Sequence, residues 1–165
     1  WEDDMLSSAD QDKLIVIMKA MEEHELAVAE LYQTAAVASP SDQAFWNGLA
    51  AMEKTHADNL ERMIAQVQAK ASRFEMGRPF NMAALKTAQE GIRQNISKIA
   101  RGALSRLQML VVARDIEQSL IEAQYGSVVK TNDVEYQTLL KEIVDQTYGH
   151  RKAIQEQIDK AQKGA

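Results

Sequence analysis

The sequence contains no cysteine in its 165 residues. This absence excludes disulfides, cysteine-ligated zinc sites and iron–sulfur clusters. Any metal site in this chain must therefore be built without thiolate ligands.

Helix-breaking residues are also scarce. The chain has only two prolines and seven glycines, and 45% of its residues are hydrophobic. Ala, Leu, Gln, Glu, Lys and Met are abundant, and all of them favour helices. This composition predicts an all-α fold, and the length favours one domain over residues 1–165.

Long hydrophobic runs and concentrated positive charge are missing too. No stretch approaches the roughly 20 residues that cross a bilayer, so we expect no membrane insertion. The net charge is −5, and the basic stretch between Lys70 and Arg78 is short. It is typical of a solvated helix end and not of a nucleic-acid interface. The acidic start, WEDDM, lacks the features of a signal sequence, so we expect a cytoplasmic protein.

The spacing of apolar residues predicts four long helices in a bundle. They run from Ser8 or Asp10 to Val37, from Ser41 or Asp42 to Lys70, from Ala103 to Val129 and from Val134 to Gln162. The short connection at Pro40 predicts an antiparallel hairpin of the first two helices. Between the second and third helices, Ser72–Arg101 reads as a long crossover with a shorter helix over Met82–Ile99. Such a crossover gives an up-down-down-up topology.

The second predicted helix carries the motif Glu53-x-x-His56. Residues three apart lie on the same side of a helix, so both side chains project together. They project from an apolar stripe of the helix, made of Phe45, Leu49, Met52, Leu60 and Met63. A carboxylate in an apolar interior needs a partner, and a bound cation is one such partner. An ordinary salt bridge on the helix surface is the alternative.

Three further polar residues occupy inward positions of the other predicted helices. Glu25, Glu117 and His150 belong to apolar stripes that read Leu14-Met18-Met21-Glu25-Val28-Tyr32-Ala35, Leu107-Leu110-Arg114-Glu117-Ile121-Gln124-Val128 and Tyr136-Leu140-Ile143-Thr147-His150-Ile154-Gln157. Inward Glu residues and Glu-x-x-His pairs are typical of di-iron carboxylate bundles. Two alternatives stay open: an ion pair of Glu117 with Arg114, and a neutral core histidine at His150. His24 is expected at the surface.

The two halves of the chain resemble each other. Glu25, Tyr32 and His56 follow one another at intervals similar to those of Glu117, Tyr125 and His150. Two such hairpins would place two ligand sets opposite each other across a bundle. When the halves are aligned on their histidines, Glu53 corresponds to Thr147, which is a poor metal ligand.

This order of residues resembles the rubrerythrin-like branch of the ferritin-like superfamily, over about Lys13 to Gln162. The resemblance implies a ferritin-like four-helix bundle that binds two non-haem irons, or one, with manganese or zinc tolerated. By resemblance, Glu25, Glu53 and His56 ligate one metal, Glu117 and His150 ligate the second, and Glu53 bridges the two.

Two tyrosines extend the resemblance, and two other positions depart from it. Tyr32 and Tyr125 are expected to donate to carboxylates across the bundle and so orient the ligands, although Tyr125 suits ordinary aromatic packing equally well. Thr147 and Leu120 stand where the family has carboxylates. The rubredoxin domain is absent, as the lack of cysteine requires.

The resemblance implies a non-haem iron oxidoreductase, peroxidase-like or ferroxidase-like, in which Fe(II) is oxidised by peroxide or oxygen. A separate partner would then supply electrons, and a homodimer is expected. The alternative is a non-catalytic bundle with a vestigial or structural metal site, acting through dimer or partner contacts. Thr147 and Arg114 favour that alternative. Iron storage in a large shell is a third and weaker one.

Overall fold

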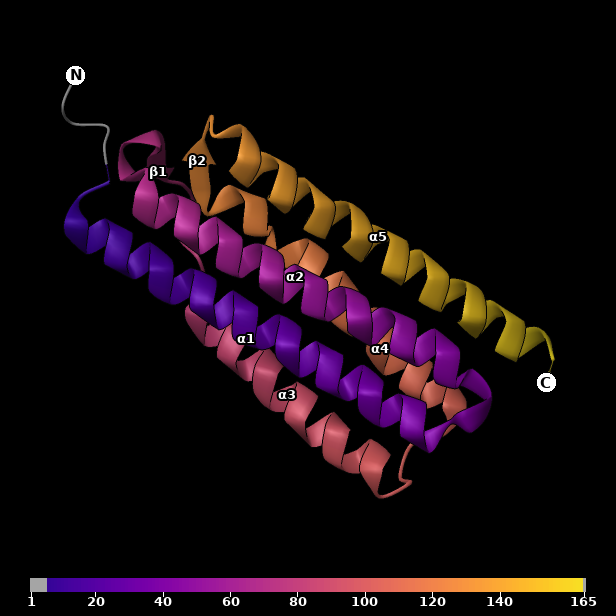
Figure 1. Cartoon of the computed structure of the whole chain (residues 1–165). Coiled ribbons are helices and arrows are strands. Elements are labelled where there is room, and N and C mark those ends of the chain that lie inside the picture. The colour runs from indigo at the N-terminus through magenta and orange to yellow at the C-terminus, as the bar shows by residue number, and fades with distance from the viewer. Residues whose placement is uncertain (1–5, 165) are drawn as a thin grey trace.

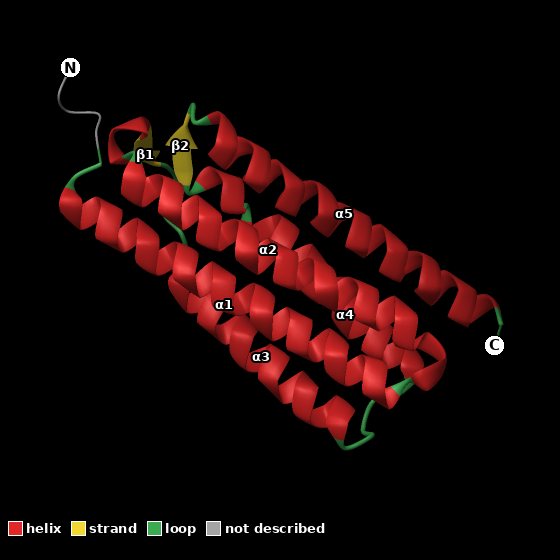
Figure 2. Ribbon diagram, viewed as in Figure 1, coloured by secondary structure: helices red, strands yellow, loops and turns green. Residues whose placement is uncertain are grey.

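The computed structural model describes residues 6–164, so the acidic start WEDDM lies outside the described residues. The fold is all-α apart from one small pair of strands (Figure 2). The helices are α1 (Ser8–Ala38), α2 (Gln43–Ala69), α3 (Met82–Ala100), α4 (Arg106–Ala123) and α5 (Val134–Lys163), and the strands are β1 (Phe74–Met76) and β2 (Val129–Thr131). Short 3-10 turns cover Pro40–Asp42, Ala71–Arg73 and Tyr125–Ser127.

Side-chain caps set the starts of several helices. The hydroxyl of Ser7 accepts a hydrogen bond from the backbone N–H of Asp10, so the cap of α1 is one residue before the predicted Ser8. Ser105 and Gln108 form a reciprocal capping box at the start of α4. Asp133 caps α5, within the turn that the sequence predicted. Such caps satisfy backbone N–H groups that the first helical turn leaves free.

The long helices form two packed hairpins, and α3 lies along the outer side of α1 (Figure 1). Arg106, at the start of α4, donates to the carboxylate of Asp42 in the connection between α1 and α2, at 2.6 and 3.1 Å. At the other end of the bundle, β1 follows α2 and pairs antiparallel with β2, which follows α4. Therefore α4 runs parallel to α2, which gives the up-down-down-up order predicted from the crossover.

The third long helix is shorter than predicted at both ends. It begins at Arg106 and ends at Ala123, not at Val129. Gln124 has a φ of 50° and so leaves the right-handed helical region. Val129–Thr131 then form β2, where β-branched side chains suit an extended backbone. Antiparallel pairing with β1 thus replaces the last helical turns of the prediction.

The predicted inward positions of α4 are partly wrong. Leu107 and Gln124 are exposed and Arg114 is partly exposed, whereas Met109, Ala113 and Leu120 are buried alongside the correctly predicted Leu110 and Glu117. His24, expected at the surface, is also buried. Helix α1 packs against both α2 and α3, so side chains on more than one face of this helix are buried.

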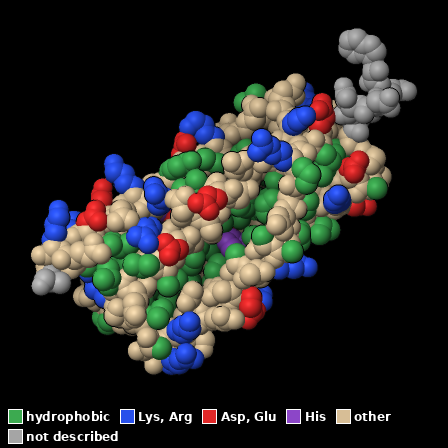
Figure 3. Space-filling model, turned by 180° about the vertical axis from the view of Figure 1, so that it is seen from behind, with side chains coloured by type: hydrophobic (Ala, Val, Ile, Leu, Met, Phe, Trp, Pro, Cys, Tyr) green, Lys and Arg blue, Asp and Glu red, His purple; other side chains and the backbone are tan. Residues whose placement is uncertain are grey.

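Two hydrophobic clusters fill the bundle, one near the strands and one toward the opposite end. The first contains Leu14, Met18, Leu60, Phe74 and Ile143, and the second contains Val28, Trp46, Leu110, Ile154 and Ile158, among others. Charged side chains lie on the outside, around patches of hydrophobic surface (Figure 3). None of the described helices combines the length and apolarity needed to span a membrane.

Candidate metal centre

Five buried polar side chains meet in the middle of the bundle. Glu25 comes from α1, Glu53 and His56 from α2, Glu117 from α4 and His150 from α5. Each is at most 4% exposed. The structure therefore brings together all five of the ligand candidates named from the sequence, and a surface salt bridge of Glu53 with His56 is wrong.

The five side chains form two groups that could each hold a metal ion. Glu25, Glu53 and His56 are one group, and Glu53, Glu117 and His150 are the other. Within each group the ligand atoms lie within 4.8 Å of one another. Glu53 belongs to both groups, so its carboxylate lies between the two candidate positions. The rings of His56 and His150 are stacked, with their centroids 5.5 Å apart. This contact agrees with two ligand sets that lie opposite each other across the bundle.

The orientation of His56 leaves one ring nitrogen for the centre. Its Nε2 lies 2.7 Å from Oε1 of Gln146. An amide oxygen only accepts, so this Nε2 carries the proton in the assigned network. Its Nδ1 faces Oε2 of Glu53 at 3.2 Å and Oε2 of Glu25 at 3.8 Å. The Nδ1 atom thus faces two carboxylates, an arrangement that a proton or a metal ion between them would stabilise.

His150 has a similar orientation from the opposite side. Its Nε2 lies 3.4 Å from Sδ of Met52, a weak acceptor. Its Nδ1 lies 2.7 Å from Oε1 of Glu53 and 3.5 Å from Oε1 of Glu117. The shorter contact is close enough for an ion pair but lacks the angle of a hydrogen bond, so Nδ1 has no hydrogen-bond partner.

Several carboxylate oxygens of the centre also lack partners. Both oxygens of Glu25, Oε1 of Glu53 and Oε2 of Glu117 are buried without a hydrogen bond. Unpaired buried carboxylate oxygens are costly, and native proteins rarely leave them unsatisfied. Cations at the two candidate positions would together supply the missing interactions. The residues present therefore fit a metal ion.

The pKa values of the histidines and of Glu25 describe how the centre binds protons when no metal is present. Burial alone would lower the pKa of His56, but the carboxylates of Glu25 and Glu53 outweigh it and raise the pKa to about 10. In the same way, Glu117 and Glu53 outweigh burial and raise the pKa of His150 to about 9. Burial, and then repulsion by Glu53, raise the pKa of Glu25 to about 8. The carboxylates that could hold a metal ion therefore also favour protons on the two histidines.

Tyr32 holds one ligand in place. Its hydroxyl donates to Oε1 of Glu117 at 2.5 Å, in a buried contact across the bundle. Burial and the nearby charge of Glu117 raise the pKa of Tyr32 well above its usual value, so the phenol stays protonated. The structure therefore places Tyr32 where the sequence analysis expected a donor.

Tyr125 does not mirror Tyr32. Its hydroxyl is buried, yet no hydrogen-bond partner for it exists among residues 6–164. The reason is the early end of α4, which leaves Tyr125 in a 3-10 turn and not on the helix. The predicted donation from Tyr125 to a carboxylate is thus not formed.

Arg114 does not neutralise Glu117. Its guanidinium donates to Oδ1 of Asp115 at 3.1 and 2.9 Å, and it lies 3.5 Å from Oε1 of Gln155. Arg114 is partly exposed, whereas Glu117 is fully buried. The alternative of an ion pair between Arg114 and Glu117 is therefore wrong.

Sequence reasoning missed two contacts of the histidines, Gln146 to His56 and Met52 to His150. Gln146 lies one helical turn before His150, which is the signal that could have identified it. Met52 directly precedes Glu53 and has no polar signature. Both side chains help to set which ring nitrogen faces the centre.

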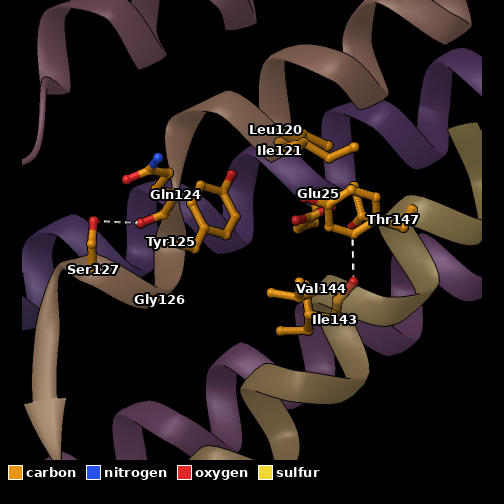
Figure 4. Close-up of a pocket in the computed structure, with 11 residues that line it drawn as sticks. Glu25, Leu120, Ile121, Gln124, Tyr125, Gly126, Ser127, Ile143, Val144 and Thr147 are labelled. Carbon is orange, nitrogen blue, oxygen red and sulfur yellow. Dashed lines mark hydrogen bonds between the residues drawn. The ribbon is translucent and has the colours of Figure 1, made fainter.

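An apolar pocket of about 360 Å³ opens beside the centre, and Glu25 and Thr147 both line it (Figure 4). The hydroxyl of Thr147 donates to the backbone carbonyl of Ile143 at 2.8 Å. This hydrogen bond directs the proton of Thr147 to the backbone, and a neutral hydroxyl supplies no negative charge to the centre. The pocket lies where the repeat predicts a carboxylate.

Comparisons with known proteins found no matching family model, no matching curated protein and no matching solved structure. The case for a function therefore rests on the chemistry of the site itself. Buried Glu and His side chains from four helices form a cluster that could hold metal ions in an all-α protein.

Proposed function

We propose that this chain is a rubrerythrin-like protein of the ferritin-like superfamily that binds two metal ions in the centre of its bundle. One observation carries the proposal: two groups of three ligands share Glu53 and leave buried carboxylate oxygens unpaired. Helix bundles with inward Glu residues and a Glu-x-x-His pair are the known layout of di-iron carboxylate proteins.

Iron is the metal that we propose for this ligand set. Three carboxylates and two imidazoles suit iron or manganese, and zinc is tolerated. The absence of thiolates in the whole chain removes the ligands that select zinc or copper(I) most strongly.

The proposed activity is that of a non-haem iron oxidoreductase. Two Fe(II) ions, when bound, supply the two electrons that reduce one hydrogen peroxide, with two protons, to two waters, leaving two Fe(III). Glu53 faces both metal positions and balances charge between them. Tyr32 fixes Glu117, and the pocket beside Glu25 gives a small oxidant a path to the centre. A separate donor returns the electrons if the reaction turns over.

Anaerobic titration with Fe(II), followed by elemental analysis and addition of peroxide, tests the proposal. Two irons per chain are expected. The amount of Fe(II) should then fall when peroxide is added. Glu53→Gln should lose both metals because Glu53 belongs to both groups. Glu30→Gln, an exposed change on α1, is the matched control and should bind as the native chain does. One iron would indicate a half-site, and no iron under any loading would contradict the proposal.

A non-catalytic bundle is the second candidate, and one observation favours it. The carboxylates raise the pKa values of His56 and His150, so protons can pair with these carboxylates without a metal, and Thr147 supplies no charged ligand. Such a protein would act through a homodimer or another partner. The double change Glu53→Ala with His56→Ala discriminates: a metal centre predicts loss of metal and lower thermal stability, whereas the non-catalytic bundle predicts higher stability.

A further inference from the structure

The pocket beside Glu25 has the size and the lining of a small-molecule site. Its volume, about 360 Å³, lies in the range typical of ligand pockets. Its walls are mostly apolar and come from α4, the turn after it and α5; they include Leu120, Ile121, Ile143, Val144 and Tyr148. Figure 4 shows the carboxylate of Glu25 reaching this pocket from α1. A ligand here would have an apolar body and would meet the metal centre at one end.

The pocket reaches Thr147, the position at which the second half of the chain lacks the carboxylate that the first half has. Thr147 corresponds to Glu53 in the alignment of the two halves, and its hydroxyl is engaged by the carbonyl of Ile143. Both oxygens of Glu25, by contrast, have no hydrogen-bond partner. Within residues 6–164, the two candidate metal groups contain no carboxylate besides Glu25, Glu53 and Glu117. The side of the centre that faces the pocket is therefore short of one anionic ligand.

The formal charges of the centre also favour one additional anionic ligand. Three carboxylates with two neutral imidazoles leave two divalent ions with one excess positive charge. An unbalanced charge in a buried site is unfavourable, and a monoanion would neutralise it. No Lys or Arg among residues 6–164 lines the pocket, so the bound metal ions would be the positive charge that attracts the anion. Tyr125 lines the same pocket, and its buried hydroxyl has no hydrogen-bond partner among residues 6–164, so this residue carries an unused donor for an anionic ligand.

We propose that the metal-loaded protein binds a small monocarboxylic acid, with its apolar body in the pocket and its carboxylate in the place left open at Thr147. This inference rests on the proposed function, because the metal ions create the charge that the acid balances. The ligand would act as the missing fourth carboxylate of the centre.

Calorimetric titration of the Mn(II)-loaded full chain with octanoate tests the inference, after elemental analysis has established its metal content. One octanoate per chain is expected. The neutral 1-octanol has the same apolar body without the carboxylate and should bind at least tenfold more weakly. The metal-free chain should also bind octanoate at least tenfold more weakly.

Two variants test the location of the site. Thr147→Glu supplies the missing carboxylate within the chain, so it should keep its metal and bind octanoate at least tenfold more weakly. Val144→Trp fills the pocket from a partly exposed position of α5 and should have the same effect on octanoate. Thr138→Val removes a comparable hydroxyl from an exposed position of α5 outside the pocket and should leave octanoate binding unchanged.

The outcomes separate the two proposals. Metal binding without octanoate binding overturns this inference and leaves the metal centre in place. Failure to bind metal overturns the proposed function and this inference with it. Equal binding of octanoate and octanol, or unchanged octanoate binding in both Thr147→Glu and Val144→Trp, overturns the assignment of the carboxylate to this pocket.

Discussion

At the scale of single residues, the metal centre is a set of unsatisfied atoms. Glu25 has two buried oxygens without partners, and the Nδ1 atoms of His56 and His150 both face carboxylates. Protons satisfy these contacts in the metal-free chain, because neighbouring carboxylates raise the pKa values of both histidines. Metal ions and protons therefore compete for the same positions.

This competition predicts opposite pH dependences with and without metal. In the metal-free chain, the favourable contacts of His56 and His150 are fully present below the ordinary histidine pKa of 6.5 and are lost as the pH rises through about 9 and 10. The raised pKa of Glu25, about 8, acts in the same direction. The free energy of unfolding should thus fall between pH 6.5 and about 10.

The stabilisation that bound metal confers should instead increase over the same interval, because fewer protons compete for the ligands. Denaturant unfolding at several pH values, with Mn(II) or with a chelator, measures both trends. If the two curves were parallel, the histidines would not be metal ligands.

The two tyrosines predict a second effect at this scale. Tyr32→Phe removes the 2.5 Å hydrogen bond to Glu117, and loss of such an orienting contact typically weakens metal binding by about 10–100-fold. Tyr125→Phe is the matched control, because the hydroxyl of Tyr125 has no partner within the described chain. Metal titration should therefore show weaker binding only for Tyr32→Phe. Equal losses would mean that Tyr125 contacts the centre once metal is bound.

At the scale of elements, the strand pair closes the end of the bundle and positions the turn that carries Tyr125. β1 and β2 pair antiparallel, with Phe74 opposite Thr131. The backbone N–H of Gly77 extends this pairing by donating to the carbonyl of Val128 at 2.8 Å. The chain approaches so closely here that a side chain at position 77 has no room.

Gly77→Ala should consequently destabilise the protein. The added Cβ would lie 2.1 Å from the backbone oxygen of Ser127, so backbone must move, at a cost of about 1–3 kcal/mol. Gly48→Ala is the matched control: it lies exposed within α2, with nothing within 4 Å of the added atom. That change should stabilise by about 0.5–1 kcal/mol, because alanine favours a helix. Denaturant midpoints measure both, and changes of the same sign would contradict this account.

At the scale of the whole molecule, the candidate metal centre joins helices that are distant in sequence. Its candidate ligands come from α1, α2, α4 and α5, between two hydrophobic clusters. A metal ion that binds only the folded chain should therefore stabilise the complete bundle. The homodimer, the cytoplasmic location and the absence of nucleic-acid partners stay predictions.

Thermal unfolding tests this linkage. At metal concentrations near a hundred times the dissociation constant, binding adds about 2.7 kcal/mol, which corresponds to a rise in Tm of about 5–10 °C for a chain of this size. Glu53→Gln should abolish the rise, whereas Glu30→Gln should retain it. A rise of equal size in both variants would place the metal elsewhere.

Much of the fold and of the centre could be predicted from the sequence, because helical periodicity is local. The spacing of apolar residues located α1, α2, α3 and α5 within a few residues, and it placed Glu25, Glu53, His56, Glu117 and His150 on inward positions. Each of these inferences depends only on neighbours three or four residues away.

The tertiary structure decided what depends on distant contacts. Pairing with β1 ended α4 at Ala123 and so separated Tyr125 from the role that Tyr32 has, and packing by α3 helped to bury His24. The donation of Arg114 to Asp115 and the pocket beside Thr147 likewise depend on how the helices pack. Periodicity shows which face of a helix points inward, but only the packed bundle brings partners from remote segments together.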